Sequence, residues 1–255
     1  MAAVVFDLDD VLVPFQTLRA WQWAWRPQGP LIGERHLGTA VRRSLHVWDR
    51  RRWLGLTGKA PPADLEALHD HLASTLRAVA GHAVAPEESE AVVRRMLHPS
   101  GEVERYPDVA PALERLRAAG VPFRVLTPLP LESARWLLHR AGLQEDLVLG
   151  AGDPPGPCVP SVEAFRAAVD RLGVPARRTA YVGDLYWSDV RAAQRAGLTG
   201  VLLDRHGVWP NVQGTRITTL ADLVPALEAA PHGEPPSPSG GGSPPPGPPS
   251  AGDFL

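Results

Sequence analysis

Residues 2–10 read Ala-Ala-Val-Val-Phe-Asp-Leu-Asp-Asp, an apolar run that ends abruptly in acidic residues. A buried central strand of a parallel sheet has this pattern, with polar groups emerging at its carboxyl end. Asp7 and Asp9 are two positions apart, so their side chains point to the same side of an extended chain. We therefore expect residues 2–6 to form a central strand that delivers two carboxylates to one place.

From residue 106 onward, short apolar runs alternate with stretches of helical spacing. Strands are expected at 123–126, 147–149, 179–182 and 200–203, and helices at 108–119, 131–141, 162–172, 188–196 and 221–230. Asp108 is expected to cap the first of these helices. This alternation predicts the α/β class, a doubly wound parallel sheet with helices on both faces. Ligands of such sheets bind outside the carboxyl ends of the strands.

The remaining segments differ in composition and spacing. Residues 39–53, 64–80 and 87–97 have helical spacing with no convincing strand between them, which predicts an inserted helical domain. Residues 231–255 contain nine Pro and six Gly, a composition that predicts a disordered tail. We expect a core of residues 1–14 and 104–230, a helical insertion at 15–103 and the tail at 231–255.

Polar residues follow several of the expected strands. Thr127 comes directly after the strand at 123–126, and Asp184 and Asp189 are five residues apart across the turn after the strand at 179–182. Several carboxylates that converge on one site repel each other unless a cation lies among them. Oxygen ligands of this kind suit Mg²⁺, which is held by a few carboxylates together with waters and a substrate phosphate.

Taken together, these segments resemble the motifs of the haloacid dehalogenase-like hydrolase superfamily. Residues 6–12, Phe-Asp-Leu-Asp-Asp-Val-Leu, resemble its first motif, Thr127 its second, and Gly183-Asp184 through Asp189 its fourth. Residues 106–109, Tyr-Pro-Asp-Val, resemble the turn that re-enters the core after the cap. The motifs occur in the family's order, and the resemblance covers nearly all of residues 2–230. It implies a Rossmann-like core with a helical cap inserted after the first motif.

The resemblance also implies a role for each of these residues. Asp7 would be the nucleophile, attacking phosphorus to give an aspartyl-phosphate, and Asp9 would protonate the leaving group and then activate water. The Asp7 and Asp184 carboxylates and the Asp9 carbonyl would ligate Mg²⁺, with Asp189 supporting the metal. Thr127 would donate its hydroxyl to a phosphoryl oxygen. The implied activity is a Mg²⁺-dependent phosphatase acting on a small phosphorylated metabolite.

The family's third motif is a lysine, and the chain departs from it. Counting six residues back from Phe165 reaches Val159, and the nearest cations in sequence are Arg140 and Arg166. Either an arginine from elsewhere occupies that space, or the protein binds its ligand with weakened catalysis, as a binding or regulatory protein. Retention of both Asp7 and Asp9 favours the enzyme.

Asp9 also bears on the type of reaction. The dehalogenases of the superfamily lack an acid at this position, so a phosphatase or phosphotransferase is preferred over a carbon–halogen hydrolase. A sugar-phosphate mutase is the remaining alternative.

The substrate should be chosen by the cap, which carries five of the eight tryptophans: Trp21, Trp23, Trp25, Trp48 and Trp53. They serve either for packing within the cap and against the core or as an aromatic substrate pocket. The sequence identifies no substrate-binding residue and no oligomeric state.

Charge and cysteine content exclude several classes of protein. The formal net charge is −2, which argues against a nucleic-acid partner. The sequence has no run of 18 apolar residues, so no membrane span is predicted. The lone Cys158 excludes an internal disulfide. We expect a cytoplasmic protein. Of the 26 basic residues only Lys59 is a lysine, so any lysine-dependent chemistry has one candidate.

Overall fold

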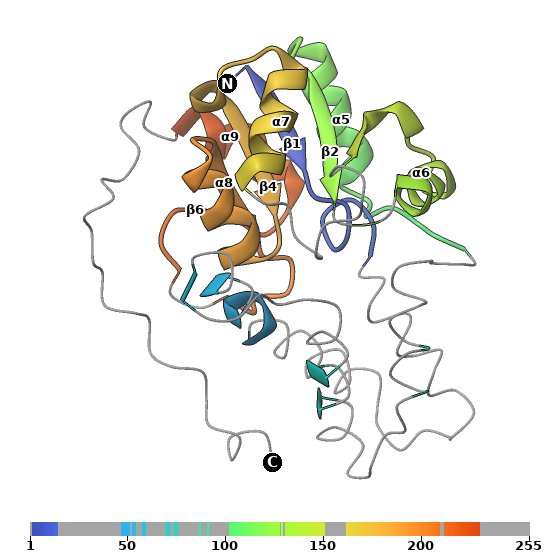
Figure 1. Cartoon of the computed structure of the whole chain (residues 1–255). Helices are drawn as coiled ribbons and strands as arrows, with labels where there is room; N and C mark the ends of the chain where they lie inside the picture. Colours follow the sequence, from blue (N-terminus) through green and yellow to red (C-terminus); the bar gives the residue numbers. More distant parts are fainter. Residues whose placement is uncertain are drawn as a thin grey trace.

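The computed structural model describes the core of the chain and short pieces of the insertion. The described residues are 2–14, 47–51, 53–54, 58–59, 70–71, 74–75, 87, 91, 102–127, 129, 131–150, 162–209 and 212–229. Six parallel strands form one sheet in the order β3-β2-β1-β4-β5-β6. Figure 1 shows β1, β2, β4 and β6 with the helices around them. Their bounds are Ala3–Phe6 (β1), Phe123–Thr127 (β2), Val148–Gly150 (β3), Thr179–Gly183 (β4), Thr199–Leu203 (β5) and Thr215–Ile217 (β6).

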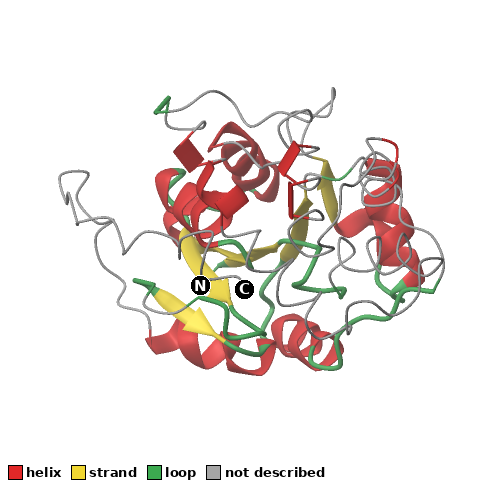
Figure 2. Ribbon diagram, turned by 90° about the horizontal axis from the view of Figure 1, so that it is seen from below, coloured by secondary structure: helices red, strands yellow, loops and turns green. Residues whose placement is uncertain are grey.

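Helices cover both faces of this sheet (Figure 2). The α-helices are α5 (Val109–Ala118), α6 (Leu131–Arg140), α7 (Val162–Leu172), α8 (Ala192–Arg195) and α9 (Leu223–Ala229). Shorter turns are the 3₁₀ segments η2 (Glu145–Leu147), η3 (Ala176–Arg178) and η5 (Leu220–Asp222) and the π-helix η4 (Tyr186–Arg191). Buried residues of α5, α6 and α9 pack on one face, and those of α7 and α8 on the other.

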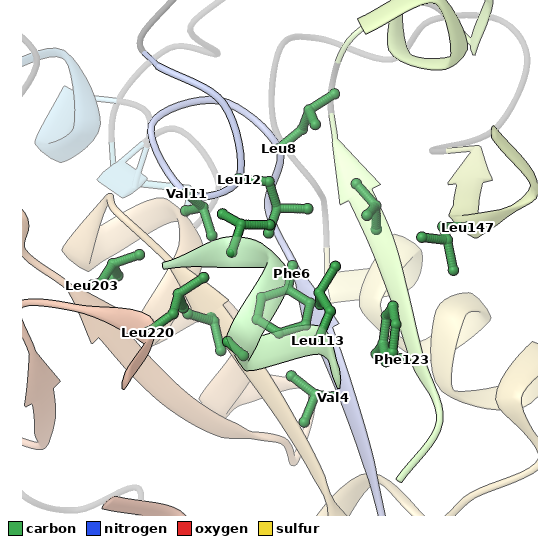
Figure 3. Packing of buried hydrophobic residues seen from close by; sticks show 14 of the residues in the cluster. Val4, Phe6, Leu8, Val11, Leu12, Leu113, Phe123, Leu147, Leu203 and Leu220 are labelled. Carbon is green, nitrogen blue, oxygen red and sulfur yellow. The ribbon is translucent and has the colours of Figure 1, made fainter. Parts of the chain in front are cut away.

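The central strand β1 divides its side chains between these two layers. Val4 and Phe6 pack into the layer that contains Leu113 of α5 and Phe123 of β2 (Figure 3). Val5 points to the opposite layer, which contains Phe165 of α7. All four residues of the strand are buried. Successive side chains of a strand point to opposite faces of the sheet, so β1 contributes to the apolar core on each face. This accounts for the uninterrupted apolar run in the sequence.

The strand order places the first and fourth motifs next to each other. The chain runs outward from β1 through β2 to β3, and then outward on the other side from β4 to β6. The order reverses between β1 and β4, and crevices at such a point bind ligands in doubly wound folds. The sequence segments after these two strands therefore meet at the carboxyl edge of the sheet.

The predicted α/β class and the parallel sheet are confirmed. One predicted element differs in kind: the helix expected at 188–196 begins at Tyr186 as the π-helix η4 and continues as α8. In η4 the amides of both Asp189 and Val190 donate to the Leu185 carbonyl, at 3.2 Å each, so the first turn is wider than an α-helical turn.

The insertion and the tail are described only in part. Of residues 15–103, those at 47–51, 53–54, 70–71, 74–75, 87 and 91 are helical, and residues 58–59 form a turn. The boundaries at 15, 103 and 231 stay predictions, and residues 231–255 lie outside the described residues. Within the described part of the chain, no helix is long and apolar enough to cross a membrane.

Candidate active site

Three carboxylates meet where β1 and β4 end. Asp7, Asp184 and Asp189 each offer an oxygen, and these oxygens lie within 4.8 Å of one another. Asp7 and Asp189 are buried and Asp184 is partly buried. Asp7 is far from Asp184 and Asp189 in sequence. The pairing of β1 with β4 brings them together.

Local backbone structure explains how the carboxylates reach one point. The Asp7 amide donates to the Val182 carbonyl at 2.8 Å, which extends the alignment of β1 with β4 by one residue. Asp189 folds back over the turn, and its Oδ2 accepts a hydrogen bond from the Leu185 amide at 3.0 Å. A Cβ on Gly183 would lie 2.5 Å from the Asp189 Cβ. Only glycine leaves room for Asp189 in this position.

The electrostatics of the cluster favour a cation. Burial raises the pKa of Asp184 well above its ordinary value, and repulsion from Asp189, Asp10, Asp7 and Asp9 raises it further. A divalent cation among these groups would relieve the repulsion. The donor set consists of carboxylate oxygens, the ligands that hard cations such as Mg²⁺ prefer. The residues present therefore fit a divalent metal ion.

Asp9 and Asp10 continue from Asp7 into a tight turn. The Leu8 carbonyl accepts hydrogen bonds from the amides of Leu12 and Val13, and Asp10 has a positive φ of 55°. Aspartate tolerates this left-handed conformation better than most residues. Asp9 is partly exposed, and repulsion from its charge is among the causes that raise the pKa of Asp184.

Thr127, the predicted second-motif residue, is the last residue of β2 and is 1% exposed. Its Oγ1 accepts a hydrogen bond from the Leu129 amide at 3.4 Å, a local turn typical of threonine. The hydroxyl is the acceptor in this bond, so it keeps a proton that it can donate to another group. Because β2 pairs directly with β1, Thr127 lies at the same edge of the sheet as Asp7.

The Asp184 backbone is held by a residue that sequence reasoning missed. Trp209 Nε1 donates to the Asp184 carbonyl at 2.8 Å, and the Trp209 ring is buried beside Tyr186. Asp204 in turn accepts the amides of Val208 and Trp209 and pairs with Arg216 at 2.7 Å. No local pattern marks Trp209, because it acts through the tertiary fold.

Asp49 is a second residue that the sequence did not reveal. It lies in the 47–51 helix of the insertion and is completely buried. Its two carboxylate oxygens accept hydrogen bonds from the amides of Trp187 and Ser188, both at 2.7 Å. Part of the insertion therefore contacts the loop between Asp184 and Asp189.

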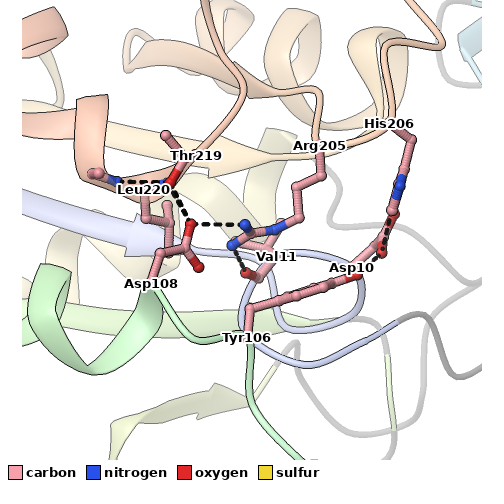
Figure 4. A network of polar contacts seen from close by, with 9 residues as sticks. Asp10, Val11, Tyr106, Asp108, Arg205, His206, Thr219 and Leu220 are labelled. Atoms are coloured by element: carbon pink, nitrogen blue, oxygen red, sulfur yellow. Dashed lines mark hydrogen bonds and ion pairs between the residues drawn. The ribbon is translucent and has the colours of Figure 1, made fainter.

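A separate polar network lies beside the site (Figure 4). Asp108 is the N-cap residue of α5, as predicted, but its side chain makes no capping hydrogen bond with that helix. The Asp108 carboxylate instead accepts hydrogen bonds from Arg205 at 2.8 Å, Thr219 at 2.7 Å and the Leu220 amide at 2.8 Å. Burial raises the pKa of Asp108, but these donors outweigh burial and hold the pKa below its ordinary value.

The same network reaches the first-motif turn. Arg205 also donates to the Val11 carbonyl at 2.8 Å, and its guanidinium lies 4.0 Å from the centre of the Tyr106 ring. The Tyr106 hydroxyl donates to Asp10, and His206 Nε2 lies 3.3 Å from the same carboxylate. Tyr106 and Asp108, predicted to re-enter the core, thus fix the turn that follows Asp9.

Val159, at the position where the family has its third-motif lysine, lies outside the described residues. Arg140 and Arg166 are both exposed, and Arg140 lies over the Trp136 ring. Lys59 is exposed.

Two of the five tryptophans within residues 15–103 take part in packing. Trp48 is 2% exposed and stacks on His71, and the Trp53 ring centre lies 5.9 Å from that of Trp187. Trp21, Trp23 and Trp25 lie outside the described residues.

Comparison with known proteins places this geometry in a family. The model of the haloacid dehalogenase-like hydrolases matches residues 1–197. The chain belongs to this family. It is 32% identical over 211 residues to a phosphatase of Mycobacterium tuberculosis (strain CDC 1551 / Oshkosh), an alignment that covers 81% of the chain and 89% of the relative. A phosphoserine phosphatase of Thermus thermophilus is 32% identical over 48% of the chain and 49% of its own length. The haloacid dehalogenase-like protein is therefore a hydrolase.

Solved structures share its fold. A magnesium-bound HAD hydrolase of Bacillus subtilis superposes with a TM-score of 0.63 at 19% identity, covering 89% of this chain and 98% of that one. The L-2-haloacid dehalogenase of Xanthobacter autotrophicus superposes with a TM-score of 0.60 at 18% identity, covering 90% and 99%. These likenesses concern the fold alone.

Proposed function

We propose that this hydrolase is a Mg²⁺-dependent phosphatase that cleaves a small phosphomonoester through an aspartyl-phosphate at Asp7. The observation that carries the proposal is the convergence of the Asp7, Asp184 and Asp189 carboxylates within 4.8 Å of one another. The phosphatase named above supports the choice of reaction, because its alignment covers most of both chains.

The chain's own residues account for both half-reactions. A carboxylate oxygen of Asp7 attacks phosphorus, the ester P–O bond breaks, and Asp9 gives its proton to the departing oxygen. Asp9 then takes a proton from water, whose oxygen attacks the aspartyl-phosphate and releases inorganic phosphate. Thr127 donates its hydroxyl to a phosphoryl oxygen and holds the group in line. Asp7 and Asp9 end the cycle in their starting states.

Asp7, Asp184 and Asp189, with the carbonyl of Asp9, would hold the metal ion. When bound, Mg²⁺ neutralises negative charge on the carboxylates and on the phosphoryl group. Trp209 holds the loop that carries Asp184 and Asp189 by its hydrogen bond to the Asp184 carbonyl. Gly183, which has no side chain, leaves the space that Asp189 occupies.

Residues 15–103 are proposed as the cap that closes over this site and selects a small phosphorylated metabolite. The contact of Asp49 with the Trp187 and Ser188 amides supports placement of at least part of the insertion beside the site.

Hydrolysis of a generic aryl phosphate tests the proposal. With Mg²⁺ present, the wild-type protein should release phosphate, and Asp7→Asn should lose at least about 10³-fold in kcat, since the nucleophile is gone. Asp222→Asn, at an exposed position far from the carboxylate cluster in sequence, is the matched control and should behave as wild type. Wild-type activity no higher than that of Asp7→Asn would contradict the enzyme.

A second candidate is favoured by one observation, the valine at position 159 where the family has lysine. A site without that cation would hold metal and phosphate but turn over slowly, as a binding or regulatory protein. Inorganic phosphate binding that depends on Mg²⁺, together with kcat equal to that of Asp7→Asn, would identify this case.

A further inference from the structure

We propose that Asp49 is a positioning residue for the metal site, through which the insertion holds the loop that carries Asp184 and Asp189. The inference rests on the proposed function and extends it, because it gives a residue of the insertion a part in metal binding. Asp49 touches neither substrate nor reacting atoms; it acts through the backbone of the loop.

The contact has the geometry of a specific anchor. Asp49 is 0% exposed, and its two oxygens each accept one backbone amide at 2.7 Å, from Trp187 and Ser188. A carboxylate is buried in this way only when its oxygens are compensated, and bonds from amides to a charged acceptor are short and strong. Trp187 and Ser188 are 138 and 139 residues from Asp49 in sequence, so the contact is a tertiary one.

The amides in question belong to the first turn of η4. Amides in the first turn of a helix have no carbonyl partner within it, so they need an acceptor from elsewhere. Asp189 supplies one for Leu185, and Asp49 supplies one each for Trp187 and Ser188. These three amides between the two loop carboxylates are therefore all bound by aspartate side chains.

This loop has a particular need for such support. It carries two of the three clustered carboxylates, and their like charges push the loop apart. Asp49 fixes the backbone between them, so the spacing of Asp184 and Asp189 is set before a cation arrives.

A second contact joins the same two segments. Trp53, four residues after Asp49, packs against Trp187 with ring centres 5.9 Å apart, and the Arg195 guanidinium lies 5.5 Å from the Trp53 ring centre. Trp187 is thus held by its amide and by its ring. These contacts couple the position of the insertion to the geometry of the loop that carries Asp184 and Asp189.

The test compares Asp49→Asn with Asp70→Asn in the full-length protein. Asp70 is an exposed aspartate in another helical piece of the insertion, so its variant removes the same charge without touching the loop. Mg²⁺ alone is titrated by calorimetry, and kcat and KM for an aryl phosphate are measured at saturating Mg²⁺. Asp49→Asn should weaken Mg²⁺ binding about 10- to 100-fold and lower kcat more than it raises KM. Asp70→Asn should match wild type.

Asp49→Glu keeps the charge and both acceptor oxygens, and it should recover part of the Mg²⁺ affinity lost in Asp49→Asn. It also serves as the test variant if Asp49→Asn does not fold. A purely structural role predicts a lower melting temperature with unchanged Mg²⁺ affinity and kcat, and that result would overturn the inference. Wild-type protein that neither binds Mg²⁺ nor releases phosphate would contradict the proposed function as well.

Discussion

Two groups of charged residues lie close to the first-motif turn, and their electrostatic environments are opposite. At the end of β4, Asp184 faces other carboxylates, and burial and repulsion raise its pKa. Beside α5, burial also raises the pKa of Asp108, but Arg205 and other donors surround it and bring its pKa below the ordinary value. A cation from solution would relieve the repulsion in the first group, whereas the Arg205 guanidinium compensates Asp108 in the second. We infer that the first serves binding and the second serves the fold.

The variant with the largest expected effect on the difference between the two groups is Asp184→Asn. Two unit charges 4 Å apart attract by about 4 kcal/mol at an effective dielectric near 20, so loss of one ligand charge should weaken Mg²⁺ binding about 10³-fold. The metal-free protein should melt about 2–4 °C higher, because a repelled carboxylate is gone. Calorimetric Mg²⁺ titration and thermal melting in EDTA measure the two effects. A lower melting temperature without metal would show that Asp184 is compensated in some other way.

Removal of the compensated carboxylate should have the opposite effect on stability. Asp108→Ala leaves Arg205, whose side chain is 9% exposed, without its charged partner, and should cost about 3 kcal/mol in the free energy of unfolding. Urea denaturation measures this loss. Glu114→Gln changes an exposed acid on the same helix and should leave stability within about 0.5 kcal/mol of wild type. Equal stability of Asp108→Ala and wild type would remove the distinction between the two groups.

Gly183→Ala probes the binding group without changing any charge. The new Cβ would fall 2.5 Å from the Asp189 Cβ, so Asp189 must move. We expect a stability loss of about 1–3 kcal/mol and Mg²⁺ affinity reduced about tenfold. Gly200→Ala is the matched comparison, since its Cβ would meet the Val190 carbonyl at 2.6 Å rather than a carboxylate. It should lose stability and keep more of the Mg²⁺ affinity than Gly183→Ala.

The smallest effect concerns pH, and the two groups predict opposite slopes. A lowered pKa stabilises the fold above the ordinary carboxyl range, so the contribution of Asp108 is lost as the pH falls below about 4. A raised pKa makes metal-free protein less stable as the pH rises, because folded Asp184 keeps its proton after the unfolded chain has lost it. Added Mg²⁺ should therefore raise the melting temperature more at pH 8 than at pH 5. Melting curves with Mg²⁺ and with EDTA measure this difference, and an equal increase at both values would contradict it.

Much of the fold was predictable because it depends on local patterns. The apolar run before Asp7 predicts the central strand, and the alternation after residue 106 predicts the parallel sheet. Asp7, Asp184 and Asp189 were predictable as a group because strand ends of a parallel sheet share one edge. Their convergence is what the structure confirms; their catalytic roles stay proposals.

The supporting residues were not predictable for a physical reason. Asp49 and Trp209 act on backbone groups far away in sequence, and neither has a spacing or composition that sets it apart. Asp108 was predicted as a helix cap because it precedes a helix, but Arg205, Thr219 and Leu220 compete for its carboxylate. Local preference gives way where charged and buried partners are available.

The π-helix η4 fixes the length of the segment between Asp184 and Asp189. In an α-helix each residue turns the chain by about 100°, so loss of one residue would carry Asp189 around to another face of the helix. The wide turn accommodates a residue that an α-helical turn would not hold. Removal of a single residue here would thus separate the carboxylates while leaving each of them in the chain. The number of residues in this segment matters as much as their identity.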